Sequence, residues 1–413
     1  MAKSSGWTTP LANHRGLRVF PDPQGGDPPA VHPPGSLAIT FFSAARVWGG
    51  AEEQTRLLAL GLRDRGHVCR FVVRRGGRVA QRIRNEGFPV LTLPRTGRDP
   101  LSIWRARWHL LETRPDVVHF VDPHAVTCGG LAAWRLRIPA RVAVRHNTFT
   151  LRWPIRYRLL CDRIICVCQA VADVCRASAI PDSMLRIVSN GSVPSSGWRE
   201  SRVVLRDRFG LPQDAPVVVT VGLLNACKGH RYLLDAWPQA VRDFPHARLA
   251  LVGDGPLEEE LRCRARALAI ERQVMFLGFR PDARDWMRAA DLLVLPSLSE
   301  GAPATVLEAM FEGCPVVTTD VGGMRELLAQ DPAEREPLGW IVSPANAGAL
   351  AATVREALAG ADQRASRAQR ARKHAQLRYT VDRMVSNTLS VYRELLGEEL
   401  LGEGERLSLQ RAA

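Results

Sequence analysis

The chain has 413 residues, of which 46% are hydrophobic and 24% are charged, and it carries a net charge of +14. This composition excludes a disordered or fibrous protein, and the length predicts two domains of roughly 150 to 200 residues each. No apolar run approaches the ~18 residues of a membrane span, and no signal peptide is evident, so we expect a cytoplasmic protein.

The positive charge is concentrated in the first half of the chain. Residues 1–206 contain 31 Lys and Arg against 14 Asp and Glu, whereas residues 207–413 contain 25 against 28. This asymmetry indicates that the first half meets an anion, such as a phospholipid surface, a phosphorylated acceptor or nucleic acid. A general bias toward arginine is the alternative. Because no known nucleic-acid-binding module accompanies the charge, we expect no nucleic-acid partner.

The first half of the chain predicts a parallel α/β sheet. Residues 1–35 are rich in Pro and Gly without an apolar period, so we expect a flexible tail there. Short apolar runs then alternate with segments of helical spacing, which is typical of a parallel sheet and defines a first domain over residues 36–195. The expected strands are Leu37–Phe42, Val68–Val73, Val90–Leu93, Val117–Val121, Arg141–Arg145 and Ile164–Val167.

The second half predicts another domain of the same class. A linker is expected near residues 195–213, followed by a second α/β series over residues 214–377. A helix with a clear apolar period is expected at residues 378–396, and residues 397–413 are expected to be a loose tail. The expected strands are Val217–Val221, Arg248–Val252, Val274–Leu277, Leu292–Leu295 and Pro315–Thr318.

Ligands of open parallel sheets lie outside the carboxyl ends of the strands. The loops after Val221, Val252, Leu295 and Thr318 are therefore expected to share one rim, and the chemistry is expected there. Gly253 follows the second of these strands and lets the backbone come close to a ligand. A plain strand-to-helix turn explains this glycine equally well.

The loop after Val221 combines glycine with a lysine. It begins at Gly222 and ends at Lys228-Gly229, just before a segment of helical spacing. Backbone amides and a helix N-terminus at such a turn favour a phosphate, and Lys228 adds a positive charge. A solvated surface lysine is the alternative interpretation.

The loop after Leu295 carries two glutamates, Glu300 and Glu308. Glu308 falls on a helix expected to begin near Ala304, with its side chain leaning toward the helix N-terminus, so both carboxylates can face one pocket. Carboxylates accept hydrogen bonds from sugar or ribose diols, and the helix N-terminus suits phosphates. Taken alone, such a pair is more often a helix-end charge and an exposed glutamate.

The order of these motifs resembles the family 4 glycosyltransferases, of group 1 type and GT-B fold, over about residues 37–395. The resemblance implies two facing Rossmann-like domains with a cleft between them. It also implies that the helix over residues 378–396 crosses back to the first domain. The matching segments are Gly49-Gly50-Ala51-Glu52, Asn190-Gly191, Glu300 through Glu308 as an E-x7-E signature, and Val321 through Glu326.

The resemblance implies retaining transfer from a nucleotide-diphosphate sugar, a UDP- or GDP-sugar, with no required cofactor or metal. Glu300 would contact the transferring sugar, Glu308 the ribose hydroxyls, and His146 the region of the reacting sugar. Lys228 would neutralise charge that develops on the diphosphate. The remaining donor-binding residues that the resemblance implies are Gly49, Gly50, Gly222, Gly253, Gly301, Ala302 and Pro303.

One position departs from the family pattern. Many members have an arginine directly after the glycine that corresponds to Gly222, whereas this chain has Leu223. The loss of one cation leaves a second hypothesis open, namely a catalytically silent sugar-nucleotide-binding or scaffold protein. The leading hypothesis is a transferase that acts on a cell-envelope, exopolysaccharide or lipid-linked acceptor at the inner face of the membrane.

The first domain is expected to bind the acceptor. Leu101, Trp104, Trp108 and Leu111 fall on one helical face, as in an interfacial helix, although packing on the sheet explains the stripe at least as well. The segment Phe149–Arg158 mixes aromatic and basic residues, and we expect it to face the acceptor or the membrane. Cys166 and Cys168 lack the paired spacing of a zinc site, so we expect buried thiols and no metal.

Overall fold

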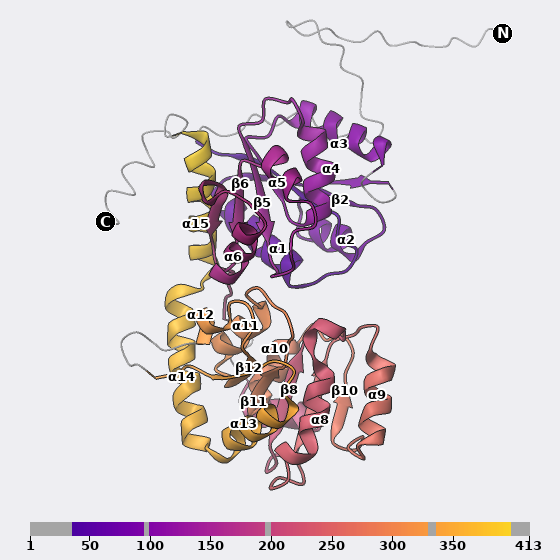
Figure 1. The fold of residues 1–413 in the computed structure, drawn as a ribbon, viewed down its shortest axis with the longest axis vertical. Helices are drawn as coiled ribbons and strands as arrows, with labels where there is room; N and C mark the ends of the chain where they lie inside the picture. The colour runs from indigo at the N-terminus through magenta and orange to yellow at the C-terminus, as the bar shows by residue number, and fades with distance from the viewer. Residues whose placement is uncertain (1–34, 95–98, 195–199, 329–335, 398–413) are drawn as a thin grey trace, which may run out of the picture.

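The computed structural model describes residues 35–94, 99–194, 200–328 and 336–397. Apart from Gly35 and Gly397, the two expected tails lie outside the described residues. Two domains follow each other along the long axis of the molecule (Figure 1). Helices α14 (Ala361–Arg378) and α15 (Val381–Leu396) run along one side, α14 beside the second domain and α15 beside the first.

The first domain contains a parallel sheet in the order β3-β2-β1-β4-β5-β6-β7. Every strand expected in this half is present, and β7 adds an edge that the sequence pattern had not indicated. The strands are β1 (Ala38–Ser43), β2 (Val68–Arg74), β3 (Val90–Leu93), β4 (Val117–Phe120), β5 (Ala140–Arg145), β6 (Arg163–Cys166) and β7 (Leu185–Ile187). The helices are α1 (Gly50–Asp64), α2 (Arg78–Asn85), α3 (Pro100–Thr113), α4 (Pro123–Ala133), α5 (Pro154–Leu160) and α6 (Gln169–Ala177).

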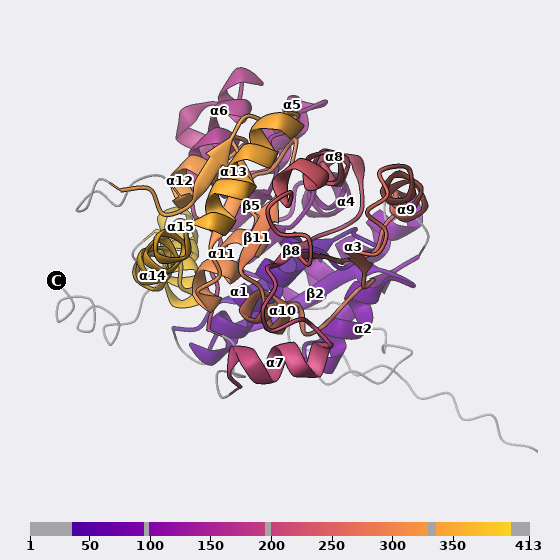
Figure 2. The same cartoon turned by 90° about the horizontal axis from the view of Figure 1, so that it is seen from below.

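The second domain repeats this plan with the order β10-β9-β8-β11-β12-β13, again parallel. Figure 2 shows α8 beside α13 on one side of the sheet and α7 beside α10 on the other. The strands are β8 (Val217–Val221), β9 (Arg248–Val252), β10 (Val274–Phe276), β11 (Leu292–Leu295), β12 (Val316–Thr319) and β13 (Trp340–Val342). The helices are α7 (Arg202–Phe209), α8 (His230–Ala240), α9 (Glu258–Ala267), α10 (Ala283–Ala289), α11 (Ala304–Glu312), α12 (Met324–Leu328) and α13 (Ala347–Ala359).

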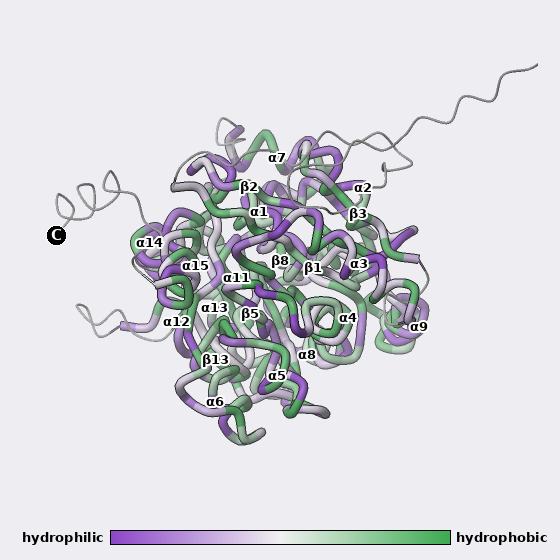
Figure 3. The backbone as a smooth tube through the Cα atoms, turned by 90° about the horizontal axis from the view of Figure 1, so that it is seen from above, coloured by the Kyte–Doolittle hydropathy of each residue, from purple (hydrophilic) through white to green (hydrophobic). Residues whose placement is uncertain are grey.

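The central strands are apolar because helices cover both faces of each sheet. All residues of β1, β4, β11 and β12 are buried, as expected for parallel strands with no solvent-facing side. Peripheral helices such as α9 and α14 are hydrophilic along much of their length (Figure 3). In each sheet the chain first adds strands on one side of the first strand and then on its other side, so the order switches between β1 and β4 and between β8 and β11. This is the doubly wound arrangement, in which ligands bind at the carboxyl ends of the strands near the switch.

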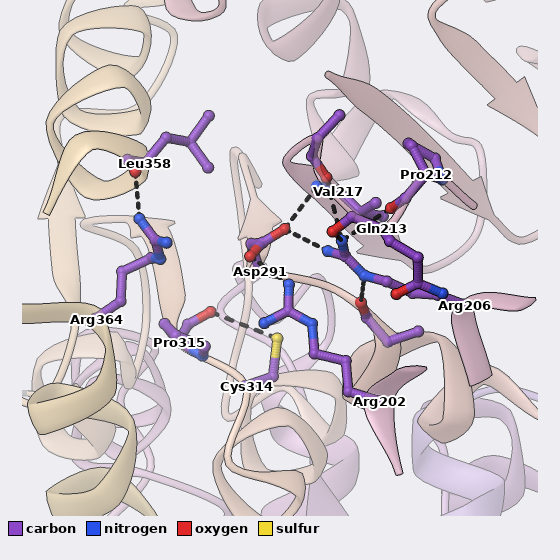
Figure 4. A network of polar contacts seen from close by, with 12 residues as sticks. Arg202, Arg206, Pro212, Gln213, Val217, Asp291, Cys314, Pro315, Leu358 and Arg364 are labelled. Atoms are coloured by element: carbon purple, nitrogen blue, oxygen red, sulfur yellow. Dashed lines mark hydrogen bonds and ion pairs between the residues drawn. The ribbon is translucent and has the colours of Figure 1, made fainter. Parts of the chain in front are cut away.

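The segment expected to be a linker contains a packed helix. Leu205 of α7 is fully buried in the core of the second domain, and Arg206 is held by the carboxylate of Asp291 at 2.6 Å (Figure 4). Arg206 also donates to the backbone carbonyls of Pro212 and Gln213. The linker expectation for residues 200–213 is therefore wrong, because α7 belongs to the second domain; residues 195–199 lie outside the described residues.

Two crossings of the chain join the domains, and they pair with each other. Ser192 forms a parallel bridge with Thr380, and its backbone N–H donates to the Tyr379 carbonyl at 2.8 Å. The helix expected over residues 378–396 begins at Val381, because Thr380 caps it by accepting from the Arg383 backbone N–H, whereas Arg378 is the last residue of α14. Tyr392 of α15 is buried against the first sheet, with its hydroxyl 2.6 Å from His119 Nδ1.

Candidate active site

Loops from the carboxyl ends of both sheets meet between the domains. The Thr148 hydroxyl, after β5, donates to the Glu300 backbone carbonyl after β11 at 3.1 Å. The Asn190 side-chain amide donates to the Ala302 carbonyl at 2.6 Å. The expected rim of the second domain therefore lies directly against the first domain.

Lys228 and Glu300 form an ion pair at this junction. Lys228 ends a short 3-10 turn that is capped by the Asn225 side chain, and its Nζ donates to Glu300 Oε1 at 2.5 Å. The Ser297 hydroxyl donates to the same oxygen at 2.7 Å. Both charged side chains are largely buried. The pair therefore places one cation and one anion in fixed positions at the carboxyl ends of β8 and β11.

The turn at Gly253 is compatible only with glycine. Its φ is +144°, and a Cβ atom there would lie 1.9 Å from the Gly222 carbonyl oxygen. The Gly222 backbone N–H donates to the Val252 carbonyl, and the Leu224 N–H donates to the Asp254 carbonyl, both at 2.9 Å. The loops after β8 and β9 are thus fastened to each other, and they position Lys228.

Glu308 lies on α11, close to the boundary with the first domain. Burial raises the pKa of its carboxyl to about 7, Arg284 acts in the opposite direction, and the nearby Glu53 and Glu312 raise the pKa further. Within the described ranges its side chain has neither a hydrogen bond nor an ion pair, so its oxygens are available to a ligand.

His146 follows β5 and is half-buried. Burial and the positive charge of Arg145 lower its pKa to about 4, so the imidazole is neutral at neutral pH. Arg145 holds the loop that follows by donating to the Phe149 carbonyl at 2.6 Å and to the Asn147 side-chain oxygen at 3.1 Å. His146 is thereby fixed at the junction of the domains.

The remaining predicted donor residues line the same junction. Gly301 lies so close to the first domain that a Cβ atom would be 2.2 Å from the His146 carbonyl oxygen. Ala302 packs against the core of the first domain, and Pro303 is the N-cap of α11. Gly49 is the N-cap of α1, and a Cβ on Gly50 would lie 3.9 Å from that of Ala304.

The apolar stripe expected on α3 does not pack on the sheet. Leu101 and Trp104 are each 60% exposed, and the rings of Trp104 and Trp108 stack at the surface, 6.2 Å apart. The packing interpretation of this stripe is therefore wrong. The face that packs inward carries smaller side chains, which allow close approach to α4: Ser102, Ala106 and Leu110.

The segment Phe149–Arg158 is only partly exposed. Phe149 and Trp153 are 54% and 66% exposed, whereas Tyr157 is buried and Arg156 donates to the Thr127 hydroxyl at 3.3 Å. The outer residues of this segment and the outer face of α3 each expose aromatic and basic side chains, and α3 and α5 both pack on α4.

The cysteines and histidines offer no metal site in the part of the chain that the structure covers. Cys166 and Cys168 are buried, as expected, but Cys168 is the N-cap of α6 and does not lie on the strand. No group of three or more His, Cys, Asp or Glu among the described residues is arranged to hold a metal ion. Likewise, no helix among those residues is long and apolar enough to cross a bilayer.

The sequence interpretation missed Arg284 of α10. Its guanidinium donates to the Val193 carbonyl at 2.6 Å and to the Ser192 hydroxyl, and it lies 3.6 Å from the Glu312 carboxylate. Arg284 thus connects the chain crossing at Ser192 to the helix that carries Glu308. No local pattern marks this residue, because arginine is frequent throughout the chain.

Two family descriptions match the chain. The first, "Glycosyltransferase Family 4", matches residues 48–194, and the second, "Glycosyl transferases group 1", matches residues 202–374. Together the two matches cover both domains.

Individual relatives match a smaller part of the chain than the two family descriptions do together. An uncharacterized glycosyltransferase of Methanocaldococcus jannaschii is 28% identical over 237 residues, which is 56% of this chain and 58% of that protein. The chain therefore spans about three fifths of that relative's length. The lipopolysaccharide core biosynthesis glycosyltransferase LpsE of Rhizobium meliloti is 29% identical over 298 residues, 68% of this chain and 79% of LpsE.

The solved structures extend the match to the whole fold. The structure of Anabaena HepE in complex with UDP-glucose superposes with a TM-score of 0.75 at 23% identity, covering 86% of this chain and all of HepE. At this identity the likeness concerns the fold alone. The fold class predicted from the sequence, two Rossmann-like domains in the GT-B arrangement, is confirmed.

Proposed function

Because this chain belongs to the group 1 glycosyltransferases of family 4, we propose that it transfers a sugar, with retention of configuration, from a nucleotide-diphosphate sugar to a cell-envelope or lipid-linked acceptor. The observation that carries this proposal is the Lys228–Glu300 pair at the junction of the two sheets. A metal is not required in this proposal, since Lys228 supplies the positive charge.

Lys228 acts on the diphosphate. In the free protein its ammonium group is held 2.5 Å from Glu300, and a donor phosphate competes for it when the nucleotide sugar binds. Negative charge develops on the leaving diphosphate as the glycosidic bond breaks, and a preorganised cation stabilises it. Glu300, released from Lys228, then accepts hydrogen bonds from hydroxyls of the transferring sugar.

Two further side chains orient the donor. Glu308 accepts hydrogen bonds from the ribose hydroxyls, which its lack of protein partners among the described residues supports. His146, neutral at neutral pH, both donates and accepts near the reacting sugar. The glycine-containing loops at Gly50 and Gly222 enclose the phosphates from the two domains.

The donor proposed first is a UDP-sugar, with a GDP-sugar as the alternative. The similar fold of HepE, whose structure was solved in complex with UDP-glucose, supports this order. LpsE acts in lipopolysaccharide core biosynthesis by its name, and this supports a cell-envelope acceptor.

The site of action is proposed to be the inner surface of the cell membrane. Exposed Trp104 and Trp153, with the exposed Arg105 and Arg152 beside them, suit the interface of an anionic bilayer. Flotation with phosphatidylglycerol vesicles tests this surface. The wild-type protein is expected to float with the vesicles, and a smaller fraction of Trp104→Ser and Trp153→Ser is expected to do so. Equal flotation with neutral phosphatidylcholine vesicles would contradict the role of charge.

The donor proposal is tested by thermal shift and calorimetry with UDP, GDP, ADP, CMP and their sugar conjugates. One nucleotide series is expected to stabilise the protein, and Lys228→Ala and Glu308→Ala are expected to weaken its binding at least tenfold. Cys263→Ala, on the exposed side of α9, is the matched control. Binding of no nucleotide would remove the proposal.

A further inference from the structure

We propose that the acceptor carries a phosphate or diphosphate group and that Arg46, Arg74 and Arg78 of the first domain bind this group. The inference rests on the proposed transferase function and names the chemical class of its acceptor.

The three arginines come together at the carboxyl edge of the first sheet. Arg46 lies in the loop after β1, Arg74 is the last residue of β2, and Arg78 is the first residue of α2. The parallel pairing of Ser43 with Val73 brings the ends of β1 and β2 side by side. The Arg78 backbone N–H then donates to the Arg46 carbonyl at 3.3 Å, which ties the two loops together.

Two of the three arginines in this cluster have no acidic partner among the described residues. Neither Arg46 nor Arg74 has a side-chain hydrogen bond or an ion pair in the described part of the chain, and Arg74 Nε is buried without an acceptor. Arg78 has only a 3.9 Å contact with Asp254. Many arginines elsewhere are paired, as Arg56 is with Glu53 and Glu86.

The Arg74 guanidinium calls for an anion, and the exposed Arg46 and Arg78 beside it add positive charge that attracts one. A buried N–H without an acceptor is unfavourable, and a ligand oxygen would satisfy it. The planar fork of arginine matches the oxygens of a phosphate, which it binds through two parallel hydrogen bonds.

The cluster faces the donor domain, as an acceptor site must. The contact of Arg78 with Asp254 crosses from α2 to the loop after β9, which is fastened to the Gly222 loop. Gly50, the first residue of α1 after the Arg46 loop, lies beside Ala304 at the start of α11. A phosphate held by these arginines would therefore lie next to the donor, on the side of the first domain.

The donor's own diphosphate has the same chemistry, so the experiment must separate the two sources. The protein is saturated with UDP or GDP, whichever binds, and inorganic pyrophosphate is titrated by calorimetry. The variants are Arg46→Gln, Arg74→Gln and Arg78→Gln, with Arg74→Lys retaining the charge. Arg84→Gln, an exposed arginine at the far end of α2, is the matched control.

We expect pyrophosphate to bind the nucleotide-saturated wild type and the control equally well. Its affinity should fall at least tenfold in Arg74→Gln and Arg78→Gln and be partly restored in Arg74→Lys, with nucleotide affinity unchanged within twofold. No pyrophosphate binding to the nucleotide-saturated wild type would overturn the inference. A tenfold loss of nucleotide affinity in the arginine variants would also overturn it, since the cluster would then bind the donor. If the wild type binds no nucleotide, the proposed function fails first.

Discussion

Replacing Glu308 with glutamine is expected to stabilise the protein at alkaline pH. Burial raises the pKa of this carboxyl from 4.5 to about 7 in the folded state, so the folded protein holds its proton more tightly than the unfolded chain does. The protonated carboxyl therefore favours the folded state. Its contribution to the free energy of unfolding is fully present below pH 4.5 and is lost as the pH rises through about 7. A glutamine side chain cannot ionise, so the variant escapes the loss.

The size of the effect follows from the two pKa values. The interval from 4.5 to about 7, at roughly 1.4 kcal/mol per pH unit, corresponds to an upper limit of about 3.5 kcal/mol in the free energy of unfolding at pH 8. Partial exposure of the side chain reduces this figure, and about 2 kcal/mol is a realistic expectation.

Urea unfolding of the wild type and of Glu308→Gln at pH 5 and pH 8 measures the effect. The advantage of the variant should be larger at pH 8 than at pH 5 by about 2 kcal/mol. Glu112→Gln, an exposed carboxyl on α3, should show no such change. A difference between wild type and Glu308→Gln that is the same at both pH values would refute the reasoning.

Three further substitutions test other features of the structure. Gly253→Ala should abolish nucleotide binding in calorimetry and lower the free energy of unfolding by roughly 2 kcal/mol or more, because its Cβ would meet the Gly222 carbonyl. Gly348→Ala on α13, whose Cβ would lie 3.6 Å from the Asn346 side-chain oxygen, should retain binding. Asp291→Ala should lower the free energy of unfolding in urea by about 3 to 5 kcal/mol, because it leaves Arg206, whose side chain is 4% exposed, buried without its carboxylate partner. Asp320→Ala removes a carboxylate from an exposed ion pair and should lower it by less than about 1 kcal/mol. Cys166→Ser should lower the melting temperature by burying a hydroxyl, and unchanged stability would contradict its burial.

The strands that the sequence predicted best are those with uninterrupted apolar runs. Val217–Val221 and Leu292–Leu295 form strands over the residues expected, because a strand buried on both faces needs no polar alternation. The edge strands Leu185–Ile187 and Trp340–Val342 were missed. Each has only three residues, too few to show a period, and its pairing with a neighbouring strand is a long-range contact.

The helix α3 shows why an apolar period does not identify the buried face. Trp104 and Trp108 carry the larger apolar surface, yet Ser102 and Ala106 face inward because α3 packs closely against α4. Residue size and neighbour geometry decided the orientation, and neither can be obtained from periodicity alone.

The site could be predicted in outline because the ends of parallel strands share an edge. That rule brings the loops of Lys228 and Glu300 to the same rim, 72 residues apart in the chain. It does not predict that the two side chains pair, or that the Thr148 hydroxyl closes on the Glu300 carbonyl from the other domain. Contacts between domains depend on how the domains dock, which local patterns do not encode.

The proposed transfer is tested most directly by following the release of nucleoside diphosphate from the nucleotide sugar that binds. Water serves as a slow acceptor, and the anomeric configuration of the released sugar is read by NMR. We expect slow release by the wild type, a product of retained configuration, and at least a hundredfold slower release by Lys228→Ala, which lacks the cation 2.5 Å from Glu300. Tight nucleotide binding with no release, alone or with added phosphorylated acceptors, would contradict transfer and indicate a silent sugar-nucleotide-binding protein in which Leu223 has replaced a needed cation.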